Sequence, residues 1–274
     1  MKTILKEFGE WLLVRKGIGE ITIRGYRACL QAMFRRIATT EPTTEQVEKY
    51  IVWMYEKKYS HSHITNTSLA IEWYFKWRGK HLKLGRPRKP KTIIKDVLTE
   101  AEVTRLIYAS KNCREKAIIS LLAYSGIRNR ELCQLRVCDI DIGDNLLRIL
   151  GGKGKRDRLI HISGDCSRIV LEYLTKHQRT PEDYLFTTMR GLQYTEWALR
   201  RLTKVLCKRT TIQKRVYPHL IRHSLATNLL RRGCHLNLIQ RQLGHADITS
   251  TMVYARSFPQ RLQQQYHLYI PSYI

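Results

Sequence analysis

The chain has 274 residues, of which 43% are hydrophobic, so it can bury the cores of one or two globular domains. Its 49 Lys and Arg residues outnumber 23 Asp and Glu, and the resulting formal net charge of +26 is spread along the whole sequence. Such a charge favours a polyanionic partner. Nucleic acid is preferred to an acidic membrane surface, because no stretch has a lipid-facing design.

The sequence shows no sign of export or of membrane insertion. No apolar run is long enough to span a bilayer, and the first residues, Met1 to Glu7, lack the apolar region of a signal peptide. The 7 cysteines are scattered and form no Cys-x-x-Cys pair, which is typical of reduced thiols and disfavours a zinc site. We therefore expect a cytoplasmic protein with no membrane partner.

Residues 1–80 are predicted to form a domain of four helices. In the first three helices apolar residues recur at helical spacing, and the third begins at Thr43 or Thr44, either of which can cap it. A fourth helix at about 62–79 contains the aromatic group Trp73 to Trp77. We expect these rings to fill the core rather than to stack on bases.

A basic linker follows at residues 81–97. Its prolines and its glycine disfavour a helix. A solvated tether is one interpretation, but in so cationic a chain we expect the linker to lie along nucleic-acid phosphates. The candidate contacts are Lys83, Arg86, Arg88, Lys89 and Lys91.

The second domain, residues 98–274, is predicted to combine helices with a small β-hairpin. Thr99 and Glu102 form a capping box at its first helix, and the apolar run 117–124 predicts a buried helix. Two strands, 146–150 and 158–162, are joined by the basic glycine-rich turn 151–157. Further helices are expected at 166–177, 194–208, 218–232 and 235–243, and then through Tyr254.

The C-terminal tail, residues 258–274, has an apolar stripe at helical spacing. The stripe consists of Phe258, Leu262, Tyr266 and Tyr269. A terminal helix with one apolar face needs a groove that buries it. The groove can belong to the same subunit or to a neighbouring one.

Two arginines and a histidine in the second domain are candidate phosphate ligands. Arg128 follows Gly126 at the start of a predicted helix, and a guanidinium fork matches two phosphate oxygens. His219 and Arg222 are three residues apart, which places both on one helical face. Each of these features is weak by itself, because such residues are also common on helix surfaces.

The remaining candidates supply acid and nucleophile. Lys153 is at the tip of the glycine-rich turn, from which an ammonium can protonate a leaving oxygen; Lys155 and Arg156 are substitutes or phosphate ligands. His245 follows Gly244, and Tyr254 can attack a phosphate that is activated by such a cage. No carboxylate cluster has metal-ligand spacing, so we expect a site without metal or cofactor.

In sequence order, four stretches resemble those of the tyrosine recombinases, also called the phage-integrase family. They are Ser125 to Leu135, Gly152 to Arg158, His219 to Thr227, and Leu243 to Tyr254. The resemblance covers nearly the whole chain. It implies that residues 1–80 form a DNA-clamping core-binding domain and that residues 98–274 form an α+β catalytic domain.

The resemblance also implies a role for each side chain. Tyr254 attacks the phosphate and forms a 3′-phosphotyrosyl bond, while Lys153 protonates the departing 5′ oxygen. Arg128 and Arg222 bind the nonbridging oxygens. His219 and His245 complete the catalytic set: they donate hydrogen bonds and help to move the tyrosine proton. Glu131 is a supporting residue behind the site.

The expected partner is double-stranded DNA with paired inverted half-sites. The resemblance implies a homotetramer on DNA, assembled from free monomers or dimers, that exchanges strands through a Holliday junction. There is no room before residue 1 for the arm-binding domain of larger phage integrases, which favours an Xer-like or compact mobile-element recombinase. Dimer resolution, integration, excision, inversion and transposition all remain open, as do the recognised sequence and any accessory protein.

Two alternatives remain at this stage. A type IB topoisomerase has a similar active site, but the short two-domain layout and the tail beyond Tyr254 favour recombination. A DNA-binding regulator without catalytic activity is the second alternative. The intact set of six candidate side chains argues against it.

Overall fold

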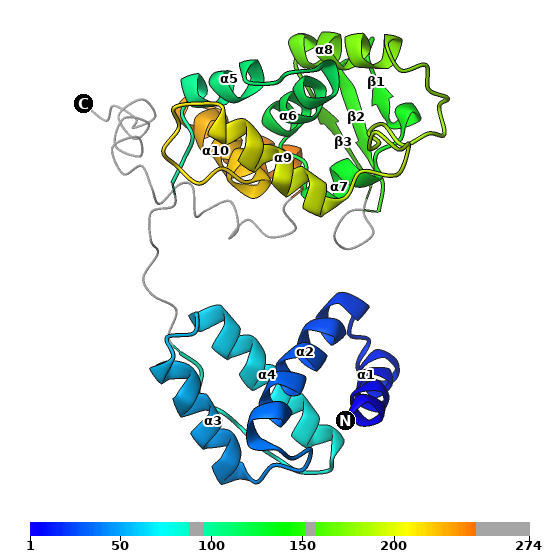
Figure 1. The fold of residues 1–274 in the computed structure, drawn as a ribbon. Coiled ribbons are helices and arrows are strands. Elements are labelled where there is room, and N and C mark those ends of the chain that lie inside the picture. Colours follow the sequence, from blue (N-terminus) through cyan, green and yellow to red (C-terminus); the bar gives the residue numbers. More distant parts are fainter. Residues whose placement is uncertain (88–95, 152–156, 245–274) are drawn as a thin grey trace, which may run out of the picture. The chain divides into compact units, whose positions relative to one another are not determined.

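The computed structural model describes residues 1–87, 96–151 and 157–244 (Figure 1). Internal contacts divide the chain into two units, residues 1–93 and 94–274, and the division falls within the stretch that the sequence assigns to the linker. Helices dominate both units, and a small antiparallel sheet lies in the second. The predicted fold class is therefore confirmed.

The N-terminal unit consists of the four predicted helices. They are α1 (Lys2–Lys16), α2 (Glu20–Ile37), α3 (Thr44–Glu56) and α4 (His61–Trp77). Thr43 is the cap of α3, because its side chain accepts from the backbone of Gln46 while the Gln46 side chain accepts in return. Helix α4 is capped by Ser60 and is two residues shorter at its C-terminal end than the predicted range.

The aromatic group of α4 fills the core of this unit, as predicted. Tyr74 and Phe75 are buried, and the rings of Phe8 and Phe34 meet Tyr74 edge-on at centroid distances of 5.6 and 5.2 Å. The Tyr74 hydroxyl donates to the carbonyl of Thr40 at 2.7 Å, so the one polar atom of this ring is satisfied.

The second unit opens with helices α5 (Glu100–Tyr108), α6 (Cys113–Ser125) and α7 (Asn129–Gln134). A short 3₁₀ turn, Val137–Asp139, leads to the sheet, and four helices follow it in the described chain. These are α8 (Gly164–Thr175), α9 (Glu196–Lys208), α10 (Pro218–Arg231) and α11 (Leu236–Leu243). The capping box of Thr99 and Glu102 at α5 is present as predicted.

The sheet has three antiparallel strands in the order β1-β2-β3. These are β1 (Ile140–Asp141), β2 (Leu146–Ile149) and β3 (Arg158–His161). Strands β2 and β3 form the predicted hairpin, in which Leu147 pairs with Ile160. Strand β1 was not predicted, because two residues are too few to show an alternating pattern.

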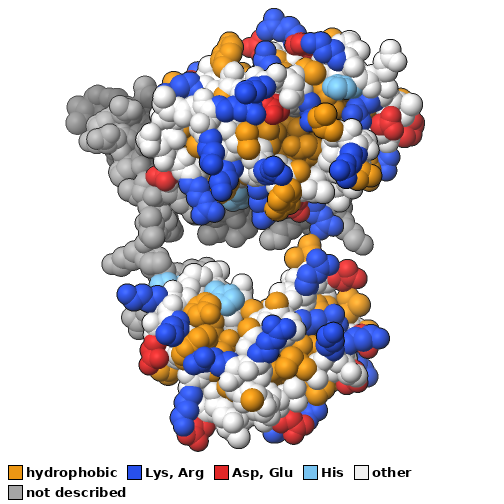
Figure 2. Space-filling view, viewed as in Figure 1, with side chains coloured by type: hydrophobic (Ala, Val, Ile, Leu, Met, Phe, Trp, Pro, Cys, Tyr) orange, Lys and Arg blue, Asp and Glu red, His pale blue; other side chains and the backbone are white. Residues whose placement is uncertain are grey.

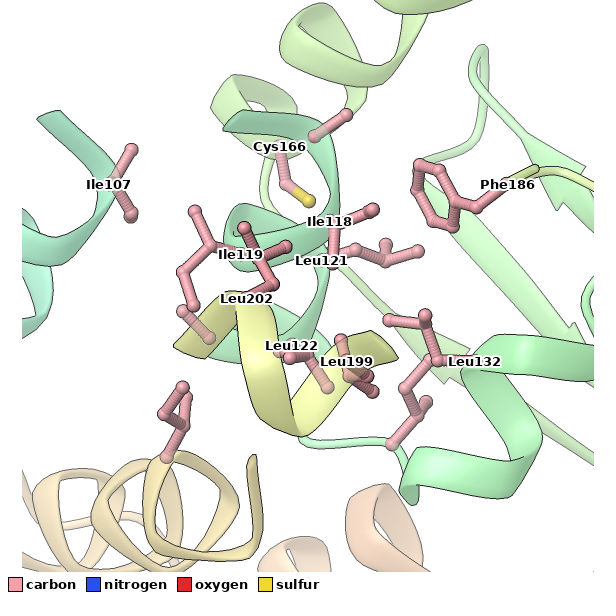
Figure 3. Packing of buried hydrophobic residues seen from close by; sticks show 14 of the residues in the cluster. Ile107, Ile118, Ile119, Leu121, Leu122, Leu132, Cys166, Phe186, Leu199 and Leu202 are labelled. Atoms are coloured by element: carbon pink, nitrogen blue, oxygen red, sulfur yellow. The ribbon is translucent and has the colours of Figure 1, made fainter. Parts of the chain in front are cut away.

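Helix α6 is the centre of the second core. Residues 117–123 of this helix are all buried, and leucines of α9 and α7 pack around them, together with Cys166 of α8 (Figure 3). A helix that is apolar on every side must be surrounded by other elements. Its C-terminal end is therefore fixed in position, and that end delivers Arg128 to the site described below.

None of the described helices is long and apolar enough to cross a membrane.

Candidate active site

Gly126 turns the chain sharply between α6 and Arg128. Its φ is 62°, which strains any larger residue, and a Cβ at this position would lie 2.8 Å from the Cδ2 carbons of Leu225 and Leu243 and would displace them. Arg128 is then the N-terminal cap of α7, with extended backbone, and its N–H donates to the Glu131 carboxylate at 2.8 Å. The turn therefore sets the Arg128 side chain beside Glu131, one helical turn further on.

The Glu131 carboxylate joins two arginines. It is 8% exposed, and it accepts from the Nη1 of Arg128 at 2.8 Å and from the Nη1 and Nη2 of Arg158 at 3.0 and 2.8 Å. Burial by itself raises the pKa of Glu131, but the hydrogen bonds from Arg158 and Arg128 outweigh burial and lower the pKa to about 2. The group is thus ionised at neutral pH, as a support for cationic neighbours must be.

Arg128 and Arg222 converge on the C-terminal end of α11. Arg128 Nη2 donates to the carbonyl of Gly244 at 2.7 Å, and Arg222 Nη2 donates to the carbonyl of Leu243 at 2.6 Å. Arg222 Nη1 also donates to the carbonyl of Gly126 at 2.5 Å. The last carbonyls of a helix lack partners within the helix and have partial negative charge, so they attract guanidinium groups.

Arg222 reaches this place from inside α10. Its side chain is buried, and the helix begins with Pro218 at its first turn, as the sequence predicted. The hydroxyl of Ser224 accepts from the backbone of Leu98 at 2.8 Å, which fixes α10 to the start of the second unit. His219 lies one turn before Arg222 on the same helix and is exposed, so α10 offers both an imidazole and a guanidinium.

Lys153, His245 and Tyr254 lie outside the described residues, but the chain that leads to two of them is described. The N–H of Gly151 donates to Asp157 at 2.8 Å, which closes the base of the turn that contains Lys153. Gly244, whose carbonyl binds Arg128, directly precedes His245. Lys155 and Arg156 also lie outside the described part.

In the linker, Lys83 and Arg86 are described, whereas Arg88, Lys89 and Lys91 are not. Glu72 of α4 accepts from the N–H of Leu84 at 2.9 Å and from Arg86 Nη2 at 2.8 Å. Leu84 also packs against the core of the N-terminal unit. The first part of the linker is therefore attached to α4, a contact that the sequence did not predict.

The charge of the sequence is visible on the surface. Lys and Arg side chains are spread over the visible face of each unit, with few acidic side chains among them (Figure 2). Among the described residues, no group of three His, Cys, Asp or Glu side chains is arranged to hold a metal ion.

Arg158 lies at the end of the stretch that contains Lys153, but its role could not be predicted from the sequence. Its contact with Glu131 joins α7 to β3. Residue spacing cannot reveal such a contact, because it depends on how the two elements pack. One feature of the sequence could have indicated it: Arg158 begins a strand that is expected to be half-buried, and a buried arginine needs an anion beside it.

The chain was compared with known proteins. The model of the phage integrase family matches residues 96–261. Tyrosine recombinase XerA of Pyrococcus horikoshii is 32% identical over 265 residues, which cover 95% of this chain and 91% of the relative. A crystal structure of XerA recombinase aligns over 99% of this chain and 100% of its own, at 30% identity and a TM-score of 0.58. The XerH site-specific recombinase bound to its difH substrate, at 19% identity, has a TM-score of 0.73 over 94% of this chain and 82% of its own, which shows a shared fold.

Replacing Glu131 by Gln should lower the free energy of unfolding near neutral pH by about 3 kcal/mol, and this deficit should shrink in acid. A depressed pKa stabilises the fold above the ordinary value of 4.5, and this contribution is lost as the pH falls through the folded value of about 2. Denaturant unfolding of both proteins from neutral pH down to about pH 3 measures the difference.

Glu172→Gln is the control, because Glu172 is an exposed carboxylate whose partner is Lys176 at 2.8 Å. Glu172→Gln should leave the free energy of unfolding unchanged within measurement error at every pH, because exposed ion pairs contribute little. A Glu131→Gln deficit that stays constant through the acid range would contradict the assignment of a depressed pKa to this group.

Proposed function

This chain belongs to the phage integrase family, so it is a tyrosine-type site-specific recombinase acting on DNA, and we propose that Tyr254 is its nucleophile. The observation that supports the proposal most is the convergence of Arg128 and Arg222 on the carbonyl end of α11, immediately before His245. The comparisons found recombinases, so the topoisomerase alternative is not retained.

We propose that the two guanidiniums bind the nonbridging oxygens of the scissile phosphate. Negative charge grows on these oxygens in the transition state, and preorganised cationic donors stabilise it without further reorganisation. Arginine has five N–H donors. The described bonds of Arg128 use one donor on Glu131 and one on Gly244, which leaves donors for a ligand.

The proposed reaction exchanges one phosphodiester for another. The Tyr254 oxygen forms a bond to the 3′ phosphorus, the bond from phosphorus to the 5′ oxygen breaks, and Lys153 gives that oxygen a proton. His219 and His245 donate hydrogen bonds to the phosphate and help to move the tyrosine proton away from the phenol oxygen. The phosphotyrosyl bond conserves the energy of the original ester, so attack by a new 5′ hydroxyl rejoins the strands without ATP or metal.

The two units are proposed to divide the work on DNA. Residues 1–80 would clamp the duplex as a core-binding domain, the linker 81–97 would follow its backbone, and residues 98–274 would hold the active site. The remaining backbone contacts are proposed for Lys83, Arg86, Arg88, Lys89, Lys91, Lys155 and Arg156. Neutralising such phosphates makes affinity fall steeply as salt rises.

We propose that four copies act together on two DNA sites, each made of inverted half-sites, and exchange strands through a Holliday junction. Relatives have been seen on their own DNA, among them a lambda integrase dimer bound to a core site. The tail, residues 258–274, is the proposed link between subunits. Xer-type dimer resolution and integration or excision of a mobile element both fit this scheme.

Covalent capture identifies the DNA site. Wild-type protein is incubated with fragmented DNA from its source, non-covalent complexes are removed with detergent, and the DNA that stays attached to protein is sequenced. The recovered sequence supplies the duplex for every experiment below.

Tyr254→Phe should bind this duplex as wild type does but form no covalent adduct, because the phenol oxygen is the attacking atom. A duplex nicked near the cleavage point releases a short strand and traps the wild-type adduct, which is measured on a denaturing gel. Tyr266→Phe, in the tail, is the matched control. An adduct of normal yield from Tyr254→Phe would disprove the assignment.

Lys153→Ala should slow cleavage of the ordinary duplex by about 10²- to 10⁴-fold, the range of a lost general acid. A duplex with sulfur at the bridging 5′ position should restore the rate, because a thiolate leaves without a proton. Lys155→Ala is the matched control and should respond equally to both duplexes. If sulfur rescues Lys155→Ala instead, then Lys155 is the acid.

Removing residues 258–274 should leave cleavage of a single half-site intact and reduce cooperative binding to paired half-sites by at least about tenfold, or about 1.4 kcal/mol. Gel-shift titrations on one and two half-sites measure the cooperativity. A full-length chain with Phe258 and Leu262 changed to Ser tests the apolar face alone, and Gln260 and Gln264 changed to Ser are its control. Unchanged cooperativity in the truncated chain would exclude the tail from the subunit interface.

A further inference from the structure

The side chain of Arg158 makes contacts that the pairing of its strand does not require. It is the first residue of β3, its side chain is 14% exposed, and both ends of its fork bond to the two oxygens of Glu131. Its Nε is also buried and makes no hydrogen bond within the described part of the chain. Such burial is unfavourable for an isolated cation, so the Glu131 carboxylate must hold it there.

The guanidinium of Arg158 also lies against Gly244. A Cβ at Gly244 would be 2.5 Å from the Nε and 2.7 Å from the Cζ of Arg158, so only glycine allows this approach. Gly244 has a φ of 63° and ends α11. Since Arg128 binds the carbonyl of the same residue, Gly244 lies between two arginines that share one carboxylate.

Strand β3 and helix α11 are joined a second time, by Gln242. Its side chain accepts from the N–H of His161 at 3.2 Å and donates to the carbonyl of His161 at 2.7 Å, as a neighbouring strand would. Its amide also donates to the carbonyl of Ser125 at 3.4 Å. The first residue of β3 is thus bonded to α7 through Glu131, and its last residue is bonded to α11 through Gln242.

We propose that Arg158 is a positioning residue for DNA cleavage, which acts by holding Arg128 in place through Glu131. Arg158 need not touch DNA to act. Without it the Arg128 guanidinium would be displaced, and a displaced guanidinium stabilises the transition state poorly. The inference rests on the proposed function, in which Arg128 binds the scissile phosphate. Strand β3 then has two roles at the site: it contains Arg158, and with β2 it flanks the turn that contains Lys153.

A second ion pair in the same unit, which is partly exposed, separates positioning from simple stability. Arg209 and Glu115 are 2.6 Å apart, with 26% and 16% of their side chains exposed, and neither contacts Arg128, Glu131 or Gly244 through any described bond. Arg209→Ala therefore removes a comparable ion pair while the network around Glu131 stays intact. It is the matched control for Arg158→Ala.

The test measures single-turnover cleavage of the captured duplex, half-site affinity and thermal unfolding for each variant. Arg158→Ala should slow cleavage by about 10²-fold, as a misplacement of about 1 Å does, with affinity within about threefold of wild type. Arg158→Lys should restore stability but only part of the rate, because an ammonium cannot bond to both oxygens at once. Arg209→Ala should lower the unfolding temperature and leave cleavage within about threefold.

The Arg158 variants are also combined with Arg128→Ala, and their cleavage rates are measured on the 5′-sulfur duplex. Cleaved product accumulates on this duplex, because the released thiolate does not rejoin the strands. If Arg158 acts through Arg128, then adding Arg158→Ala to Arg128→Ala should lower the cleavage rate by no more than about threefold. A further loss of about 10²-fold there, or a normal cleavage rate in Arg158→Ala or Arg158→Lys alone, would overturn the proposal. If the wild type forms no adduct, the proposed function itself fails, which is a separate outcome.

Discussion

The described active site depends on one buried carboxylate. A chain with a formal charge of +26 brings Arg128 and Arg158 side by side, and without an anion these cations repel each other and lose their hydration. Glu131 bonds to both, and these hydrogen bonds outweigh burial and lower its pKa to about 2. Because Arg128 lies at the start of α7 and Arg158 at the start of β3, the Glu131 side chain joins this helix to this strand.

The same arrangement explains the glycines. Gly126 and Gly244 both have positive φ, and both lie where a Cβ would collide with a neighbouring side chain. These positions let α6 and α11 end close together, so that Arg128 and Arg222 reach the free carbonyls of α11. The residue that follows those carbonyls is His245. The two helix ends, the two arginines and the two glycines thus form one connected arrangement.

Much of the fold could be predicted because its determinants are local. Thr43 and Thr99 cap helices through bonds that involve only their neighbours in sequence. The structure places the cap of α3 at Thr43, one of the two threonines expected, and the cap of α5 at Thr99 as predicted. A role for Arg128 and Arg222 could be proposed because a guanidinium suits a phosphate and because both residues lie in stretches that resemble those of the tyrosine recombinases. The contact of Arg158 with Glu131 could not be predicted, nor that of Arg86 with Glu72, because each joins elements whose packing is set by the whole core.

The central claim is that Arg128 and Arg222 stabilise negative charge on the scissile phosphate, and a neutral phosphate tests it most directly. A duplex with a methylphosphonate at the cleavage position lacks one charged oxygen. On the ordinary duplex, Arg128→Ala or Arg222→Ala should slow cleavage by about 10²- to 10³-fold. On the methylphosphonate duplex each variant should lose far less relative to wild type, because little charge remains to be stabilised. Equal losses on the two duplexes would mean that these arginines only support the fold, and would contradict the account.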